Sequence, residues 1–484
     1  MYSRFGLLID GEWRDAVGKQ TRNVFSPVNE DIIGTVPNAQ EQDIQAALRA
    51  AQLGFDIWSK TPAWERAKVL RKASELIRQR QAESAHIMSV ETGKPIGESM
   101  GEINAAADQF EWYSEEAKRL YGQIIPARNQ DEQLQVVYHP VGPCLALSAW
   151  NFPALLPARK IAAALAAGCS VVARPASEAP GSCFVIAQAL MDAGLPKNVL
   201  TVMTGQPDPM VNQLISSDII KKVSLTGSVP VGKKILHQAA DGIKKISMEL
   251  GGHAPVIVHH DVDPVKTAHK LAATKFRNCG QVCISPSRFY IHSSIYEKFV
   301  DAFVEFTNGL VLGDGLVDGV TTGPMIREQA VNGALSLIED AIEKGAELLT
   351  GGHRAKQFNK GHFLQPTVLA NVPDNARIMR EEPFAPVAPI TAFDNFDEVI
   401  KKANSTEFGL AAYLFTHDSA LAQKTAMALE AGMVGINETL LATAEAPFGG
   451  IKQSGFGREG GTLGIMDYVV PKYIRHKLIT KEVE

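Results

Sequence analysis

The sequence predicts an α/β protein with more than one domain, and three observations support this fold class. Short apolar runs such as CSVVARP and KKVSLTG alternate with segments of helical spacing from 141 to 251, and the alternation returns from 252 to about 430. Strands separated by helices of this length form parallel, doubly wound sheets, which bind ligands at the carboxyl ends of their strands. With 484 residues the chain also exceeds what one hydrophobic core usually supports, so we expect two or three domains.

The N-terminal part shows a change of pattern from strands to helices. Residues 7–37 alternate short β-like runs with turn signals, including Asp10-Gly11, which predicts a hairpin laid over a larger domain. From about 40 to 120 the pattern is helical, and Thr61-Pro62 predicts a helix start. We expect these helices to cover a sheet.

The helices of the two alternating regions have predictable bounds, because apolar residues recur at helical spacing between the strand-like runs. Residues 122–140 contain only an unassigned strand, LQVVY, after a polar loop. The predicted helices are 156–167, one through Leu190, 208–216, 230–240, 264–276, 295–308 and one from 330 to 344.

Composition and charge exclude several classes of partner. The formal net charge of −5 offers no broad basic field for nucleic acid. The uncharged run from 141 to 158 is interrupted by prolines and ends at Arg159, so we expect a buried strand and helix start and no membrane span. Five scattered cysteines and an N-terminus without a signal peptide indicate a reducing, cytoplasmic location.

The stretch KFRNCGQVCISPSR (275–288) contains the first candidate for chemistry, Cys283. Glycine, amides and a basic residue surround this thiol, and such donor-rich neighbours lower the pKa of a cysteine and make it nucleophilic. Cys279 lies close enough for a disulfide with Cys283, although a packed thiol is the favoured interpretation. Partner ligands for zinc are missing at this spacing, so we predict no metal site.

Glu249 is a second candidate, placed between the apolar run KKISM and a Gly-Gly turn. Apolar neighbours disfavour the charged form of a carboxyl group, so its pKa rises toward that of a general base. A third candidate is the turn that opens at Gly227 and continues to Lys234, which nearly spells a phosphate-binding P-loop. Lys234 stands where a P-loop needs Ser or Thr, but a glycine turn before a helix still suits a pyrophosphate.

Together with Cys283 and Glu249, four further motifs occur in a recognisable order. They are AWNFP at 149–153, LTGS at 225–228, EEPFAPV at 381–387 and PFGGIKQSGFGRE at 447–459. From about Leu8 onward the chain resembles the aldehyde dehydrogenase superfamily, and within it the succinate semialdehyde and 2-oxoglutarate semialdehyde dehydrogenases.

The resemblance implies a Rossmann-like dinucleotide-binding domain, a second α/β catalytic domain and a small β oligomerisation segment. The dinucleotide-binding domain would comprise 1–121 and 141–251, and the catalytic domain 252–453. Residues 122–140 and 467–484 would form the oligomerisation segment, with 454–466 as a return helix or linker. A homodimer or homotetramer is the expected assembly.

The implied reaction is NAD(P)-dependent oxidation of an aldehyde through a cysteine thiohemiacetal and thioester. In it Cys283 is the nucleophile and Glu249 activates water, which favours hydrolysis over transfer to coenzyme A. The side-chain amide of Asn151 and the backbone N–H of Cys283 would form the oxyanion hole.

The resemblance also implies coenzyme contacts, and two of them favour NADP over NAD. Serine at 177, with the guanidinium of Arg174 nearby, could accommodate a 2′-phosphate that a glutamate would repel. Ala385 replaces the glycine that the family has after Phe384, which leaves the local backbone angle open. The implied coenzyme-binding residues are Trp150, Arg174, Ser177, Gly227, Ser228, Leu250, Glu382 and Phe384.

Arg159 and Arg277 match positions that bind the distal carboxylate in succinate semialdehyde dehydrogenases, and guanidinium groups bind a planar carboxylate bidentately. The serine that those enzymes add to the pocket is Ala442 here, with Thr443 beside it. Succinate semialdehyde is therefore the first expected substrate, with 2-oxoglutarate semialdehyde or a broader range of aldehydes as alternatives. A P-loop nucleotide hydrolase and a non-catalytic binding protein are the alternatives from other classes.

Overall fold

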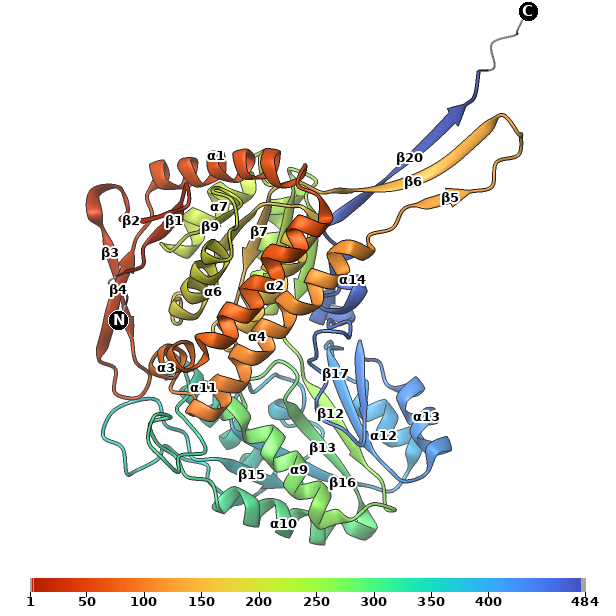
Figure 1. Cartoon of the computed structure of the whole chain (residues 1–484). Coiled ribbons are helices and arrows are strands. Elements are labelled where there is room, and N and C mark those ends of the chain that lie inside the picture. The colour runs from red at the N-terminus through yellow and green to blue at the C-terminus, as the bar shows by residue number, and fades with distance from the viewer. Residues whose placement is uncertain (1, 3, 480–484) are drawn as a thin grey trace, which may run out of the picture.

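The computed structural model describes residues 2 and 4–479 and has two stacked lobes, each built on a mostly parallel sheet (Figure 1). A slender arm of antiparallel strands projects from the upper lobe.

The first sheet lies in the upper lobe and has the strand order β19-β11-β10-β7-β8-β9-β1-β2. The strands from β11 to β9 are parallel, whereas β19, β1 and β2 join antiparallel at the two edges. The chain adds β8 and β9 on one side of β7 and then β10 and β11 on the other, so the strand order reverses between β7 and β10, where ligands bind in open α/β sheets. The bounds are β1 Leu7–Ile9, β2 Glu12–Arg14, β7 Cys144–Leu147, β8 Val171–Arg174, β9 Leu200–Val202, β10 Lys222–Thr226, β11 Lys245–Glu249 and β19 Gly455–Phe456.

The hairpin expected at Asp10-Gly11 forms, with both residues in the left-handed region. It does not lie over the domain, because β1 pairs with β9 and thereby extends the edge of the first sheet. A second hairpin joins β3 (Thr21–Phe25) to β4 (Ile32–Pro37).

The second sheet lies in the lower lobe and has the order β14-β15-β16-β13-β12-β17-β18. Only β14 is antiparallel to its neighbour. The bounds are β12 Ala254–Val258, β13 Pro286–His292, β14 Glu347–Thr350, β15 Thr367–Ala370, β16 Val387–Phe393, β17 Ala411–Phe415 and β18 Met433–Ile436.

Helices cover both faces of each sheet. Buried side chains of α1, α7 and α8 share one apolar cluster in the upper lobe, and those of α2, α4, α5 and α6 share another. In the lower lobe α9 and α10 cover one face and α11, α12 and α13 the other. The bounds are α1 Glu41–Trp58, α2 Ala63–Gln79, α3 Gln81–Thr92, α4 Ile96–Glu116, α5 Leu155–Ala167, α6 Gly181–Asp192, α7 Pro207–Ser216, α8 Val229–Ala240, α9 Pro264–Phe276, α10 Tyr296–Asn308, α11 Glu328–Glu343, α12 Phe396–Ala403, α13 Ser419–Ala428 and α14 Gly461–Met466.

Helix α5 is buried along its whole length. A helix that is surrounded by protein on all sides needs no polar stripe, which explains the uncharged run that precedes it in the sequence. Among the residues that the structure describes, every helix is too short or too polar to cross a bilayer.

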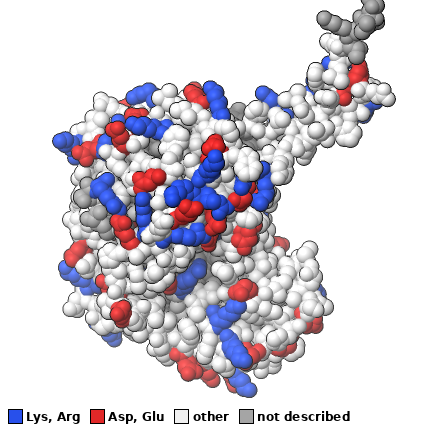
Figure 2. Space-filling view, in the orientation of Figure 1, with Lys and Arg blue, Asp and Glu red and all other residues white. Residues whose placement is uncertain are grey.

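The arm consists of β5 (Gln123–Ile125), β6 (Glu132–Pro140) and β20 (Val469–Lys477). β6 pairs with β20 over nine residues, which is the association that the family resemblance implied for these two segments. Several large side chains of the arm face solvent, including Ile124 at 90% and Tyr473 at 58% exposure. In the space-filling view the arm is mostly free of charge where it leaves the body, while both signs are interspersed over the upper lobe (Figure 2).

Candidate active site

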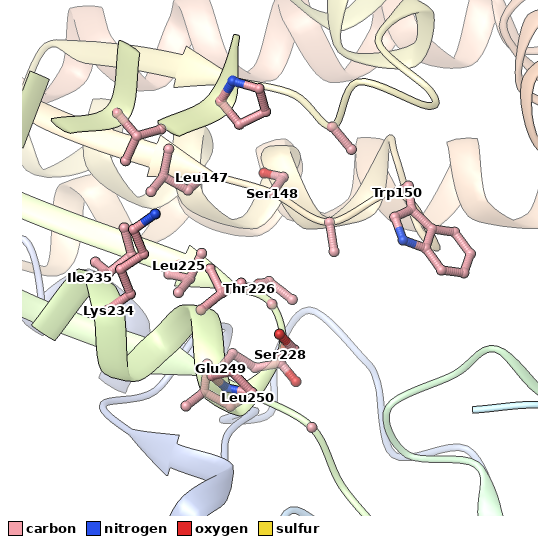
Figure 3. Close-up of a pocket in the computed structure, with 18 of the residues that line it drawn as sticks. Leu147, Ser148, Trp150, Leu225, Thr226, Ser228, Lys234, Ile235, Glu249 and Leu250 are labelled. Atoms are coloured by element: carbon pink, nitrogen blue, oxygen red, sulfur yellow. The ribbon is translucent and has the colours of Figure 1, made fainter. Parts of the chain in front are cut away.

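A cavity of about 730 Å³ lies at the point where the strand order of the first sheet reverses. Its walls come from the carboxyl ends of β7, β10 and β11 and from loops of the lower lobe that lead into β13 and β16. Figure 3 shows Leu147, Trp150, Thr226, Ser228 and Glu249 among the lining side chains. Strand ends that are far apart in the sequence thus meet at one surface.

Glu249 and Cys283 both line this cavity. Glu249 is the last residue of β11 and is buried, while Cys283 lies in the loop before β13 and is partly exposed. Burial is the main reason why the pKa of Glu249 rises to about 7, and the neighbouring carboxylate of Glu459 raises it further. The expectation of an elevated pKa for this carboxyl group is therefore confirmed.

The expectation that the neighbours of Cys283 lower its pKa is wrong for this arrangement. Burial raises the pKa of the thiol well above its ordinary value, and the facing carboxylate of Glu249 raises it further. The charge of Arg159 lowers the pKa of the thiol, but its effect is smaller than those of burial and Glu249. The protonated thiol faces a carboxyl group that titrates near neutrality, so Glu249 is placed to accept its proton.

A strained turn carries the polypeptide into the cysteine loop. Asn278, Cys279 and Gly280 all have left-handed backbone angles, with φ of 49°, 54° and 69°. A Cβ at Gly280 would lie 2.2 Å from the carbonyl oxygen of Ala385, so only glycine fits there. Cys279 is a free thiol, buried in the apolar cluster that contains Ile257, as expected for a packed residue.

Asn151 follows β7 and lies against the cysteine loop. Its Nδ2 donates a hydrogen bond to the carbonyl oxygen of Gln281 at 3.2 Å, and the residue is buried. The structure therefore brings together the amide of Asn151, the thiol of Cys283 and the carboxyl group of Glu249, the three side chains that the sequence singled out for catalysis.

The coenzyme candidates also converge. Trp150, Arg174, Gly227, Ser228, Leu250, Glu382 and Phe384 line the large cavity. Ser177 is not on its wall, but its hydroxyl accepts a hydrogen bond of 2.8 Å from the Nη2 of Arg174. The N-terminus of α8 at Ser228 has no side-chain cap, and the Nε of Arg174 is buried without a partner in the described structure. Backbone N–H groups and a guanidinium with a free donor fit the phosphates of a dinucleotide.

The backbone angle left open by Ala385 is now explained. The residue with the left-handed angle is Phe384, at φ 41°, whereas Ala385 is buried in an ordinary conformation. The ring of Phe384 meets that of Trp150 edge to face at 5.7 Å. Burial raises the pKa of the nearby Glu382 to about 7, and this side chain accepts a hydrogen bond from the N–H of Gly252.

The two candidate arginines lie outside the wall of the large cavity. Arg159 is buried, stacks on the ring of Phe448 at 4.1 Å and leaves Nε and Nη2 without partners among the described residues. Arg277 lines a second cavity of about 220 Å³, which is bounded by the residues on either side of Cys283, and its Nε is also unpaired. Ala442 lines this cavity, whereas Thr443 is half-buried beside it.

The structure adds residues that the sequence patterns did not reveal. Arg327 lines the large cavity from the lower lobe and forms an ion pair of 3.5 Å with Glu178. Below Glu249, Lys160 forms a buried ion pair with Glu459. Glu459 ends the quoted motif at 447–459 and Lys160 follows Arg159, so these positions offered a usable signal, but no local pattern marks Arg327. Lys234, the residue that departs from the P-loop pattern, pairs with Asp208 at 2.9 Å.

Comparison with known proteins agrees with this geometry. The model of the aldehyde dehydrogenase family matches residues 13–474.

The chain belongs to the aldehyde dehydrogenase family.

As a member of this family it is an NAD(P)-dependent aldehyde dehydrogenase. It is 43% identical to the succinate-semialdehyde dehydrogenase [NADP(+)] GabD of Escherichia coli, over 96% of each chain. It is 42% identical to a glutarate-semialdehyde dehydrogenase of Pseudomonas putida, again over 96% of each. The crystal structure of succinate-semialdehyde dehydrogenase from Burkholderia pseudomallei superimposes with a TM-score of 0.95 at 42% identity, covering 98% of both chains.

The raised pKa of Glu249 predicts how the hydrolytic step depends on pH. Glu249 accepts a proton only when ionised, so thioester hydrolysis should rise between about pH 6 and 8 and level off above, because the pKa is about 7. Glu249→Gln should slow this step roughly 10²- to 10⁴-fold and remove the inflection. Single-turnover hydrolysis of the acylated enzyme, measured against pH, checks this. The exposed Glu75→Gln serves as control, and an inflection that persists in Glu249→Gln would assign it to another group.

Proposed function

We propose that the enzyme oxidises a semialdehyde that carries a distal carboxylate, with succinate semialdehyde as the first candidate, and uses NADP in preference to NAD. The observation that carries the proposal is the pair of arginines, Arg159 and Arg277, whose buried nitrogens lack partners beside Cys283. An unpaired buried guanidinium is costly, and a substrate carboxylate would satisfy it bidentately. The names of the Escherichia coli and Burkholderia relatives, both succinate-semialdehyde dehydrogenases, support this choice.

In the proposed mechanism Glu249 accepts the proton of Cys283, and the resulting thiolate attacks the aldehyde carbon. The amide of Asn151 and the backbone N–H of Cys283 donate hydrogen bonds to the oxyanion that forms; losing one such donor typically costs on the order of 10²- to 10³-fold in rate. The nicotinamide coenzyme, when bound, supplies the two-electron acceptor. Loss of a hydride from the thiohemiacetal carbon leaves a thioester on Cys283, and Glu249 releases its proton to solvent. Ionised again, Glu249 accepts a proton from a water molecule, whose attack on the thioester releases the acid and a thiolate that is then reprotonated.

Residues of the large cavity would hold the coenzyme. Trp150, Phe384 and Glu382 lie near Cys283 and would hold the nicotinamide half, while Gly227, Ser228 and Leu250 would face the pyrophosphate.

A positively charged side chain in the cavity supports the proposed preference for NADP. Arg174 lines the cavity and already donates to Ser177, so a guanidinium group and a hydroxyl could face a 2′-phosphate. Glu178 opposes this charge but is paired with Arg327. The name of the relative from Escherichia coli specifies NADP(+).

A longer semialdehyde is the second candidate, and Ala442 favours it. Where the succinate semialdehyde enzymes would place a serine, the smaller alanine lines the 220 Å³ cavity, which leaves room and removes one hydrogen bond. The relative from Pseudomonas putida is a glutarate-semialdehyde dehydrogenase.

The arm supports a proposed homodimer or homotetramer. Ile124 and Tyr473 are exposed on the three-stranded sheet of the arm, and a second copy of the chain would cover this apolar surface.

A panel of aldehydes tests the proposed substrate class. We expect kcat/KM to be highest for succinic, glutaric or 2-oxoglutaric semialdehyde and lowest for uncharged aliphatic aldehydes of equal length, with each coenzyme. Cys283→Ala should abolish oxidation of all of them, because no thioester can form. Better turnover of uncharged aldehydes would refute the two-arginine pocket, and undiminished activity of Cys283→Ala would refute the mechanism.

Arg277→Leu should raise KM for succinate semialdehyde roughly 10- to 100-fold, since a hydrogen-bonded charge pair is lost. The KM for an uncharged aldehyde should change little. Steady-state kinetics on both substrates checks this, with Arg71→Leu, a surface arginine, as control. An equal change for both substrates would mean that Arg277 does not recognise the carboxylate.

Ser177→Glu should shift coenzyme preference roughly 10- to 100-fold toward NAD, because the new carboxylate repels a 2′-phosphate and occupies Arg174. Binding of adenosine 2′,5′-bisphosphate and of adenosine 5′-monophosphate, measured by calorimetry, reports the same preference without turnover. Ser177→Ala is the matched control. If Ser177→Glu weakens the binding of both nucleotides equally, the 2′-phosphate does not lie at Ser177.

A further inference from the structure

Helix α4 presents two carboxylates on one face, the half-buried Glu98 and the buried Glu102. They are one helical turn apart and therefore point the same way. Each of them accepts hydrogen bonds from a different loop of the candidate active site, one that carries Asn151 and one that leads to Cys283. Neither carboxylate belongs to the motifs that the sequence singled out.

Glu102 holds the loop of Asn151. Its Oε1 accepts hydrogen bonds from the N–H groups of Ala154 at 2.8 Å and Leu155 at 3.2 Å, where α5 begins. These N–H groups have no partner within the helix, so the carboxylate both caps α5 and fixes the chain just after Asn151.

Lys94 completes this contact. Its ammonium group forms a buried ion pair with Glu102 and donates a hydrogen bond of 3.0 Å to the carbonyl oxygen of Asn151. It also lies 4.4 Å from the ring centre of Phe152. Because Lys94 and Glu102 are both almost completely buried, their charges compensate each other without help from solvent.

Glu98 holds the second loop. Its Oε2 accepts a hydrogen bond of 2.9 Å from the N–H of Asn278, at the strained turn before Cys283. The side chain of Asn278 in turn donates to the carbonyl oxygens of Asn151 at 3.0 Å and Gln281 at 3.1 Å. The amide of Asn151 donates to that same carbonyl of Gln281. The two loops are thus joined to each other and to one rigid helix.

We propose that Lys94, Glu98 and Glu102 are positioning residues that set the separation between the two oxyanion donors, the Asn151 amide and the N–H of Cys283. This inference rests on the proposed roles of Asn151 and Cys283. The hydrogen bonds that the three residues make to the Asn151 and cysteine loops all go to main-chain atoms, so they act through the placement of these donors. A displacement of roughly 1 Å in such a site can cost about 10²-fold in rate.

The test is a double-mutant cycle between Lys94→Met and Asn151→Ala, measured as kcat for the preferred semialdehyde. Alone, Lys94→Met should lower kcat roughly 10- to 100-fold with little change in KM, because only transition-state stabilisation is lost. In the Asn151→Ala background the same substitution should lower kcat by less than about threefold, because the donor that it positions is already absent. Glu102→Gln, which keeps the shape of the side chain, should behave in the same way.

Lys94→Arg, which keeps the charge, should restore part of the activity, and Glu111→Gln, on the solvent side of α4, should match the unmodified enzyme. If Lys94→Met fails to fold, as judged by thermal unfolding, Glu98→Gln replaces it in the cycle.

If kcat of the double variant falls by the product of the two single-variant factors, the positioning role is overturned. A change that Lys94→Met makes only in KM would overturn it as well. Asn151→Ala with undiminished kcat would instead refute the oxyanion hole itself, so the two failures are distinguishable.

Discussion

The site depends on the close approach of the two sheets at Gly251 and Gly252. A Cβ at Gly251 would lie 2.5 Å from the Glu382 carboxylate, and one at Gly252 would lie 2.5 Å from the carbonyl oxygen of Cys283. At Gly252 the obstacle is backbone, so only glycine permits the contact, whereas at Gly251 it is the end of the flexible Glu382 side chain. Because the chain passes through these residues directly from β11 into β12, the carboxyl ends of the first sheet meet loops that precede strands of the second. A side chain at Gly252 would displace the backbone of Cys283 from the end of β11, where Glu249 lies.

The close approach of the two sheets also determines the pKa values of the groups that lie between them. Glu249, Glu382 and Cys283 lie at a buried junction, and burial raises the pKa of each of them. Arg159 and Lys160 moderate this by lowering the pKa of Glu249, which stays near neutrality. A carboxyl group in that range can both accept and release a proton during one reaction cycle, whereas an exposed glutamate would remain ionised.

Backbone hydrogen bonds place the remaining groups. The strained turn at 278–280 is stabilised by its contacts with Glu98 and Gln281, and the Asn151 loop by Lys94 and Glu102. Strained backbone persists only where surrounding structure overdetermines it, and here both loops are fixed to α4. The helix that holds both loops thus belongs to the upper lobe, while the thiol of Cys283 lies on a loop of the lower lobe.

Hydrophobic periodicity alone determined most of the elements: helix α9 has the predicted bounds, and α5, α7, α8 and α10 each begin within one residue of them. Local pattern also singled out Glu249, through its apolar run and glycine turn, and the resemblance of the motifs singled out Asn151. The tertiary structure alone decided the pKa of Cys283, since its flanking residues indicated a lowered value, whereas burial and then the carboxylate of Glu249 raise it. It alone revealed Arg327 and the Lys94–Glu102 pair, and it placed the Asp10-Gly11 hairpin at a sheet edge. Periodicity reports which face of a segment is buried, but desolvation and Coulomb interactions depend on neighbours that only folding brings within a few ångströms.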